Sequence, residues 1–316
     1  MKPAGLGFLV AFFSSLFGQT PSIITSVGYS SPSPVAVAPG QVITLFARTK
    51  TTLTQPVVAS SSTLPTTLGG FSVALTQTFS SDPIAVPIFS AAPVVACTEV
   101  APSVCTTSTA ISIQIPFELG ANVQGAHLPE NFAALTVTDN GDIGEPIGLN
   151  PVSAQIHILN SCDTPLNPQS GPCNTIFQHA DGSLVSAANP AAAGETITLQ
   201  AYGLGLGDGR IPTGMPSPSP AVSVSGVAVD FRFGTDIAIT TPGPNASTLA
   251  AQLVPGSVGL YQLAFTVPMA PAGTPGCSAV TNNLTVIIGR GNSFDGASLC
   301  MQQSDSKRKP SLSPSK

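Results

Sequence analysis

Charged side chains are scarce in this chain of 316 residues, where Asp, Glu, Lys and Arg together make up only 8 % of the sequence. Long surface helices depend on Glu, Lys and Arg, so this scarcity argues against a helical fold. The 30 Gly and 31 Pro instead suit short strands separated by turns. We therefore expect an all-β protein, and the length favours two domains because single cores seldom grow beyond roughly 250 residues.

Aromatic side chains that could form a binding platform are also few. Trp is absent, and Tyr occurs only at Tyr29, Tyr202 and Tyr261. Glycan-binding surfaces commonly use exposed rings that are apolar at one end and polar at the other. Tyr261 lies inside a predicted strand and is expected in the core. Tyr202, which precedes a glycine-rich stretch, is the candidate ligand contact.

After residue 18 no apolar run reaches the roughly 18 residues that a membrane-spanning helix needs. The one long apolar run, Leu6 to Phe17, follows Lys2 and precedes Gly18. This pattern predicts a signal peptide over residues 1–18 with cleavage near Gly18, rather than a membrane anchor, for which the run is too short. We expect a protein that is secreted, periplasmic or at the cell surface, with no transmembrane segment in the mature chain.

Basic residues are scarce as well. Outside segments 1–18 and 304–316, five Lys or Arg stand against fourteen Asp or Glu, a net charge of about −9. Nucleic acid binding relies on clustered cations, so it is not expected of this chain. Segment 304–316 holds Lys307, Arg308, Lys309 and Lys316 among Ser and Pro, and is expected to be a disordered basic tail. Contact of that tail with an anionic envelope is the alternative.

The cysteines are even in number, and in an exported chain this predicts disulfides. They fall into three pairs of sequence neighbours, and pairing each with its neighbour is the most economical connectivity. No pair has the CxxC spacing of metal or redox sites. The predicted disulfides are Cys97 with Cys105, Cys162 with Cys173, and Cys277 with Cys300.

An internal repeat divides the chain into two halves. Four strand-like strings of the first half return in the same order, about 150 residues later, in the second half. The clearest pair has Gly-Gln-Val-Ile-Thr-Leu at 40–45 and Gly-Glu-Thr-Ile-Thr-Leu at 194–199. The paired strings are 38–47 with 192–201, 70–73 with 226–229, 112–116 with 264–268, and 135–137 with 284–286.

Each half thus reads as short alternating strands between Gly, Pro, Ser and Asn clusters, which is typical of an antiparallel sandwich. We predict two tandem immunoglobulin-like β-sandwiches. Their expected bounds are 22–160 and 179–303, joined by a disulfide-bearing connecting loop at 161–178.

Several strings resemble an uncharacterised C-terminal β-domain family named after Solibacter, which is found in exported proteins of soil bacteria and is similar in style to IPT/TIG immunoglobulin-like modules. The resemblance implies a fold and carries over no catalytic residue. The matching strings are Ala-Asn-Pro at 188–190, Gly-Glu at 194–195, Tyr-Gly-Leu-Gly at 202–205, the segment 255–262, and more weakly 38–41 and 114–119 in the first half.

Two motifs that suggest catalysis or nucleotide binding have simpler interpretations. The glycine-rich stretch 203–209 lacks the following helix that a phosphate-binding loop needs, and is expected to be a loop after a strand. His179, Asp181 and Ser183 include the residue types of a hydrolytic triad within five positions. Triads draw these residues from separate elements, so we expect a polar turn there. His127 and His157 stand alone and are expected on a loop or strand face.

The string Asp139-Asn140-Gly141-Asp142 offers oxygen ligands but lacks the spacing and terminal Glu of an EF-hand loop. Asn-Gly is a strong hairpin signal, so a turn is predicted and a calcium site is the alternative. No other cofactor or metal is expected.

The sequence therefore favours a non-enzymatic secreted or cell-envelope module that works in adhesion, scaffolding or ligand binding through its loops, with an unknown protein or glycan as partner. The alternative is an extracellular hydrolase, acting on a glycan or an ester, with an unrecognised site between the domains.

Overall fold

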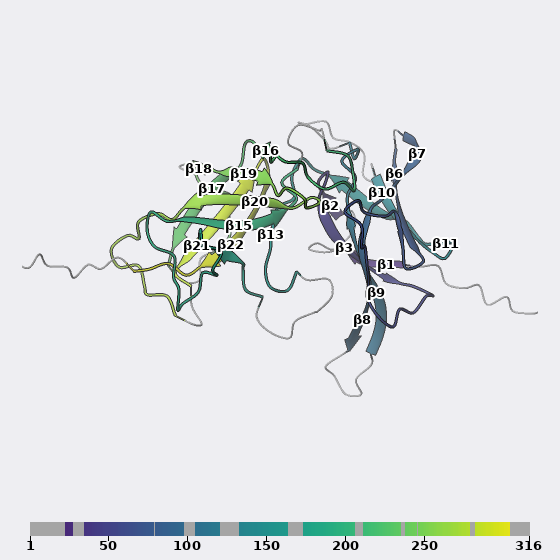
Figure 1. Cartoon of the computed structure of the whole chain (residues 1–316), viewed down its shortest axis with the longest axis horizontal. Helices are drawn as coiled ribbons and strands as arrows, with labels where there is room; N and C mark the ends of the chain where they lie inside the picture. The colour runs from purple at the N-terminus through teal and green to yellow at the C-terminus, as the bar shows by residue number, and fades with distance from the viewer. Residues whose placement is uncertain are drawn as a thin grey trace, which may run out of the picture.

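The protein is all-β in the computed structural model (Figure 1), as the composition predicts. The structure describes residues 23–27, 35–78, 80–97, 105–120, 133–163, 173–205, 211–234, 238–244, 246–278 and 282–303, and no helix occurs among them. These residues accordingly hold no helix that is long and apolar enough to cross a membrane. The predicted signal peptide and basic tail lie outside the described residues, as do Tyr29 and His127.

The first half forms two sheets, in which neighbouring strands are antiparallel except that β2 runs parallel to β12. The first sheet has the order β1 (Ile23–Val27), β3 (Val42–Arg48), β9 (Cys105–Gln114), β8 (Ile88–Cys97), β4 (Val57–Val58). The second has the order β2 (Val35–Val37), β12 (Ile147–Pro151), β10 (Ala133–Asp139), β6 (Phe71–Gln77), β5 (Thr67–Leu68), with β11 (Asp142–Ile143) on β10 and β7 (Ser80–Ala85) on β6.

The second half also forms two sheets. One has the order β13 (His157–Ile158), β15 (Thr196–Tyr202), β20 (Tyr261–Thr266), β19 (Ala250–Leu253), β16 (Ser223–Val224), with β14 (Phe177–Gln178) also on β15. The other has the order β18 (Ser247–Thr248), β17 (Ala228–Phe233), β21 (Leu284–Arg290), β22 (Ser293–Leu299). A parallel bridge joins Ala191 to Met301 beside β22.

Each half has its own hydrophobic core, filled by alternate side chains from its two sheets. In the first half Leu45 and Ile111 from one sheet meet Val73 and Val137 from the other, and all four are buried. Strand residues alternate between the two faces of a sheet, so every second residue reaches the core. Burying such a side chain contributes about 1.5–3 kcal/mol. Leu199, Leu263, Val229 and Val286 have the same role in the second half.

The repeated strings lie in strands with equivalent neighbours. In the first half β3 pairs with β9 and β6 with β10, and in the second half β15 pairs with β20 and β17 with β21. Leu45 stands opposite Ile111, as Leu199 stands opposite Leu263. The order of strings in the sequence thus reflects one strand arrangement built twice.

The division between the halves lies earlier than the expected boundary at 161–178. β13 and β14 flank the cysteine loop, and both pair with β15. Ile158 and Phe177 accordingly belong to the core of the second half. The cysteine loop is therefore a connection within the second half, and the chain passes from one half to the other between β12 and β13. β13 and β14 have two residues each, which is too short to show the alternation of apolar and polar residues that marks a strand in a sequence. The boundary predicted from the sequence therefore lies too late.

Two of the predicted disulfides are confirmed. Cys162 bonds to Cys173 and Cys277 to Cys300, with Cα–Cα distances of 5.2 and 5.5 Å. The remaining bridge stays a prediction, because the side chains of Cys97 and Cys105 are outside the described set. The backbone pairing nevertheless places these two residues opposite each other at the end of the β8–β9 ladder, which extends away from the rest of the first half (Figure 1).

Candidate functional site

Among the described residues, a group of ionisable side chains surrounds His157, where the chain enters the second half. The His157 Nε2 atom lies 2.9 Å from Asp163 Oδ2, and its Nδ1 atom lies 3.9 Å from Asp295 Oδ2. The side chains of His157 and Asp163 are each 16 % exposed. We call His157, Asp163, Asp295 and Tyr202 the His157 cluster.

Local hydrogen bonds fix both carboxylates of this cluster. Asp163 Oδ2 also accepts from the backbone N–H of Asn160, at 2.7 Å, just before the Cys162–Cys173 bridge. Asp295 Oδ2 accepts from the N–H of Ile158, also at 2.7 Å, so that β22 holds the outer edge of β13. The cluster therefore attaches the entering strand and the disulfide loop to the sandwich.

Burial raises the pKa of the Asp295 carboxyl above its ordinary value, and the nearby Asp163 charge raises it further. The N–H groups of Ile158 and Gly296 and the imidazole of His157 oppose this effect. The His157 imidazole thus has a carboxylate oxygen on each side, 2.9 Å from Nε2 and 3.9 Å from Nδ1. An imidazole between two carboxylates is a set of groups that can take part in acid–base chemistry.

Tyr202, the predicted ligand contact, lies on β15 directly opposite His157. Its ring is only partly exposed, and burial together with Asp163 raises the pKa of its hydroxyl to about 12. The phenol is therefore protonated at neutral pH. The other predicted ring, Tyr261, is in the core at 1 % exposure and donates a hydrogen bond to the carbonyl of Gly205, as expected for a buried Tyr.

His179, Asp181 and Ser183 form a polar turn and are not arranged as a catalytic relay. The N–H of Gly182 donates to the His179 carbonyl, and Ser183 Oγ donates to Asp181 Oδ1 at 2.7 Å. The His179 ring instead contacts Glu195, with Nδ1 at 2.5 Å from Oε1. A relay needs the His between the nucleophile and the acid, so this geometry gives no activated Ser.

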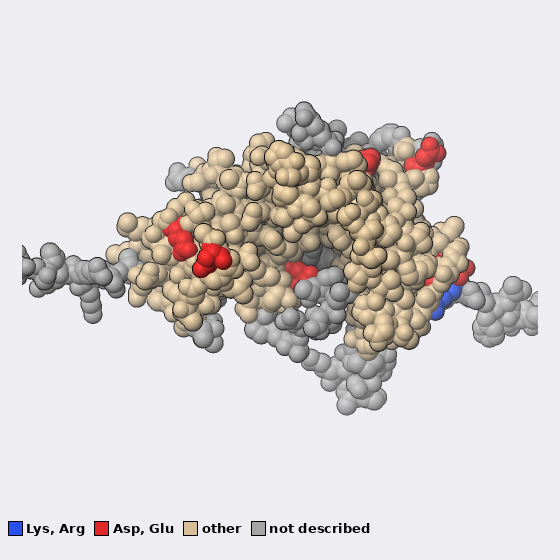
Figure 2. Space-filling model, in the orientation of Figure 1, with Lys and Arg blue, Asp and Glu red and all other residues tan. Residues whose placement is uncertain are grey.

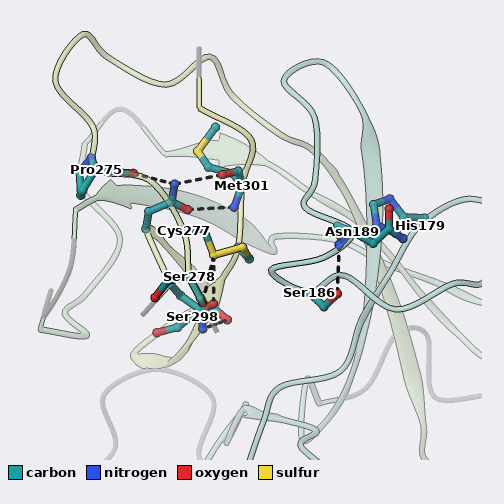
Figure 3. The surroundings of a disulfide bond; sticks show 11 residues. His179, Ser186, Asn189, Pro275, Cys277, Ser278, Ser298 and Met301 are labelled. Atoms are coloured by element: carbon teal, nitrogen blue, oxygen red, sulfur yellow. Dashed lines mark hydrogen bonds between the residues drawn. A yellow bond between two sulfur atoms is a disulfide. The ribbon is translucent and has the colours of Figure 1, made fainter. Parts of the chain in front are cut away.

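The His179–Glu195 pair has shifted pKa values. The hydrogen bond to Glu195 raises the pKa of His179, and the same bond lowers the pKa of Glu195. The other ring nitrogen of His179, Nε2, lies 3.2 Å from the Asn189 carbonyl oxygen, and Figure 3 shows these two residues next to each other. The pair thus anchors the loop that leads into β15.

The side chain of Asn283 holds the chain after β22 in place. It donates from Nδ2 to the carbonyls of Pro275 and Met301 and accepts from the Met301 N–H (Figure 3). Met301 follows Cys300 directly, so these bonds and the Cys277–Cys300 disulfide fix the same segment.

The Asp139–Asp142 string forms the predicted hairpin turn. Asn140 and Gly141 have φ values of 48° and 92°, the positive pair that a tight two-residue hairpin needs. Buried Asp139 accepts from the N–H groups of Lys50 and Thr51, and Lys50 Nζ lies 2.6 Å from Asp142. The Asp139 carboxylate thus already accepts hydrogen bonds within the first half, which argues against the calcium alternative.

The described part of the glycine-rich stretch, 203–205, is a packed segment. Gly203 accepts a hydrogen bond from Gln155 N–H at 2.7 Å, and Arg290 donates to the Leu204 carbonyl. Its glycines have positive φ values of 75° and lie against backbone atoms of residues 153–155. Residues 203–205 therefore allow this part of the chain to pack closely against the backbone of residues 153–155.

No group of three or more potential metal ligands occurs among the residues that the structure describes. On the face shown in Figure 2, acidic side chains form separate small groups, and basic side chains occupy one small area.

Asp163 and Asp295 are partners of His157 that no sequence pattern indicates. Asp295 lies 138 positions away from His157, so only the fold brings the two together. No family model matches the chain, and no curated protein matches it either. The resemblance to the Solibacter-named family therefore stays a prediction.

Proposed function

We propose that the chain is an exported protein of two immunoglobulin-like sandwiches that acts by binding a protein or glycan through its loops. The sheet order carries the proposal. In such sandwiches one sheet has strands A-B-E-D and the other G-F-C. Counting β3, β6, β8, β9, β10 and β12 as B to G, both sheets of the first half follow that order, and β1 takes the place of A.

The second half supports the same assignment. Its sheets run β13-β15-β20-β19 and β17-β21-β22, which match A-B-E-D and C-F-G. Both halves also have a parallel contact between an early segment and the C-terminal edge, as β2 on the last strand β12 and as the bridge of Ala191 to Met301 just after β22. This shared edge contact supports the proposal that both halves have the same fold.

The disulfides support the proposed location. Two bonds between sequence neighbours, Cys162–Cys173 and Cys277–Cys300, are stable in oxidising compartments and rare in the cytosol. Together with the predicted signal peptide, they favour a secreted, periplasmic or surface-attached protein.

Binding through loops is the activity that rigid sandwiches commonly support. Several polar side chains that could be offered for chemistry are used in structural bonds here, as with Asp139, Glu195 and Asn283. Connecting segments are then the parts left to contact a partner.

A retention experiment tests the proposal. The mature protein, with disulfides intact, is incubated with cell-wall fractions, polysaccharides and the secretome of the producing organism, and retention and product release are scored separately. We expect selective retention of one fraction without product. Turnover of any component, or no retention by any fraction, would count against the proposal.

The hydrolase alternative has one observation in its favour, the His157–Asp163 pair flanked by a second carboxylate. A histidine held by an acid is a common general base. Chromogenic ester and glycoside substrates test it directly. Turnover that His157→Ala abolishes and Asp181→Ala preserves would establish the hydrolase and displace the binding proposal.

A further inference from the structure

The two halves meet through a loop of the second half that enters the first. Ile211 belongs to the core of the second half, and three residues later Gly214 contacts the first half. The Gly214 N–H donates to Gln114 Oε1 at 2.7 Å, and its carbonyl accepts from the Leu64 N–H at 2.8 Å. Gln114 has no exposed surface, so these bonds are shielded from water.

A second contact lies beside the first. The N–H of Phe117 donates to Thr213 Oγ1 at 2.8 Å, and Thr213 Oγ1 donates to Glu118 Oε2 at 2.5 Å. The Phe117 side chain packs against the core of the second half, although the residue follows β9 of the first. The first half therefore also reaches into the second.

A third contact brings two glycine backbones together. A Cβ atom on Gly259 would lie only 2.7 Å from the carbonyl oxygen of Gly40 and 3.1 Å from Val42 Cγ2. Gly40 in turn faces Phe117, whose ring a Cβ atom at Gly40 would meet at 2.0 Å. The halves approach more closely here than any side chain would allow.

The contacting segments of the second half are themselves braced. The Ser217 N–H donates to the Ser257 carbonyl and the Gly256 N–H to the Ser217 carbonyl, so the 211–217 loop is tied to the turn that carries Gly259. Because these two segments are hydrogen-bonded to each other, their contacts with the first half resist hinge motion better than two independent contacts would.

We infer that the two halves form one rigid body, locked by the insertion of residues 213–215 and by the Gly259–Gly40 contact. Interfaces between domains of one chain ordinarily permit relative motion unless they are extensive and well packed. The three contacts lie around the buried Gln114 side chain and the Phe117 ring. They therefore fix the relative orientation of the two halves as well as their separation. A partner then meets loops of both halves as one surface. The inference does not depend on what the protein binds.

A distance measurement between two spin labels tests the inference. Position 143 in the first half and position 184 in the second are 71 % and 57 % exposed, so labelled non-canonical residues fit at both. We expect the otherwise unaltered full chain to give a single narrow distance distribution. Gly259→Ala should broaden it, because the new methyl group collides with the Gly40 carbonyl.

Gly256→Ala is the matched control. Gly256 has a φ of 78°, close to the 67° of Gly259, but a Cβ atom there meets nothing within 4 Å. It therefore reproduces the backbone strain without the collision, and the distribution should stay narrow. Phe117→Ala, which adds no strain, should also broaden the distribution and serves if Gly259→Ala does not fold. A broad distribution in the unaltered chain, or a narrow one in both Gly259→Ala and Phe117→Ala, would overturn the inference.

Discussion

The contacts between the two halves differ in kind from the contacts that attach loops to the second half. The joint is made mainly of neutral groups, namely glycine backbones, the Gln114 amide and the Phe117 ring, and the Glu118 carboxylate takes part only through its bond with Thr213. The loop attachments are ionisable, as in the His157 cluster and the His179–Glu195 pair. Neutral close packing does not change with pH, whereas ion pairs do. We therefore expect the contacts of the Gln114 amide and the glycine backbones to depend less on pH than the two ionisable loop attachments.

The largest effect is expected from Gly203→Ala, at a second close approach, where Gly203 lies against the connecting residue Gln155 and near the Gln41 side chain of the first half. A Cβ atom at Gly203 would lie 1.7 Å from the Gln155 carbonyl oxygen, a backbone atom that cannot swing aside. With φ at 75° the substitution is strained as well. We expect a loss of about 3–6 kcal/mol in the free energy of unfolding, measured by urea denaturation.

Gly194→Ala provides the matched control for Gly203→Ala. Its φ of 83° carries the same strain, but its Cβ atom meets nothing within 4 Å. The expected loss is only about 1–2 kcal/mol. Equal losses in the two variants would mean that close packing at Gly203 contributes nothing.

Gln114→Ala should have the next largest effect. Removing the amide leaves the Gly214 N–H at the joint without its acceptor, and an unsatisfied buried donor costs about 1–3 kcal/mol. Because no group in this contact titrates, the loss should be the same at pH 5 and pH 8. Chemical denaturation at both values measures it, and a loss that varies with pH would contradict the neutral character assigned to the Gln114 contact.

Asp295→Asn examines the ionisable side of the comparison. The pKa of Asp295 is raised in the folded protein, so its contribution is favourable at low pH and is lost as pH rises through the folded value. Asn keeps an oxygen that can accept from the Ile158 N–H but cannot ionise. Relative to the parent, the variant should therefore be more stable at pH 7 than at pH 3.5, by denaturation at the two values. The opposite order would mean that the charge of Asp295 is stabilising.

Sequence reasoning found the long strands and missed what lies between them. Strings such as Val42 to Ala47 carry the alternation and β-branched residues that specify a strand whatever its neighbours are, and their repeats lie in equivalent strands. β13 has only two residues, and it forms a strand because it pairs with β15 and because Asp295 accepts a hydrogen bond from the Ile158 N–H. The stretch that contains Gly203 is predicted as a loop, but the close packing of Gly40 and Gly203 depends on segments far away in the sequence.

The smallest effect is expected from His179→Ala. The raised pKa of His179 contributes stability that is complete below its ordinary value of 6.5 and is lost as pH rises through the folded value. The lowered pKa of Glu195 contributes stability that is present above 4.5 and is lost as pH falls through the folded value. The pair therefore stabilises the folded state most between about pH 4.5 and 6.5, by no more than about 1 kcal/mol because its side chains keep some contact with water.

Thermal unfolding from pH 3 to 9 should show the parent and His179→Ala furthest apart in that window. Glu195→Gln should lose stability in the same window, because it removes the same pair. Two variants with differently shaped pH profiles would show that His179 and Glu195 act separately, and the loop would then owe its attachment to the backbone bonds of Asn189 and Ala191 rather than to charge.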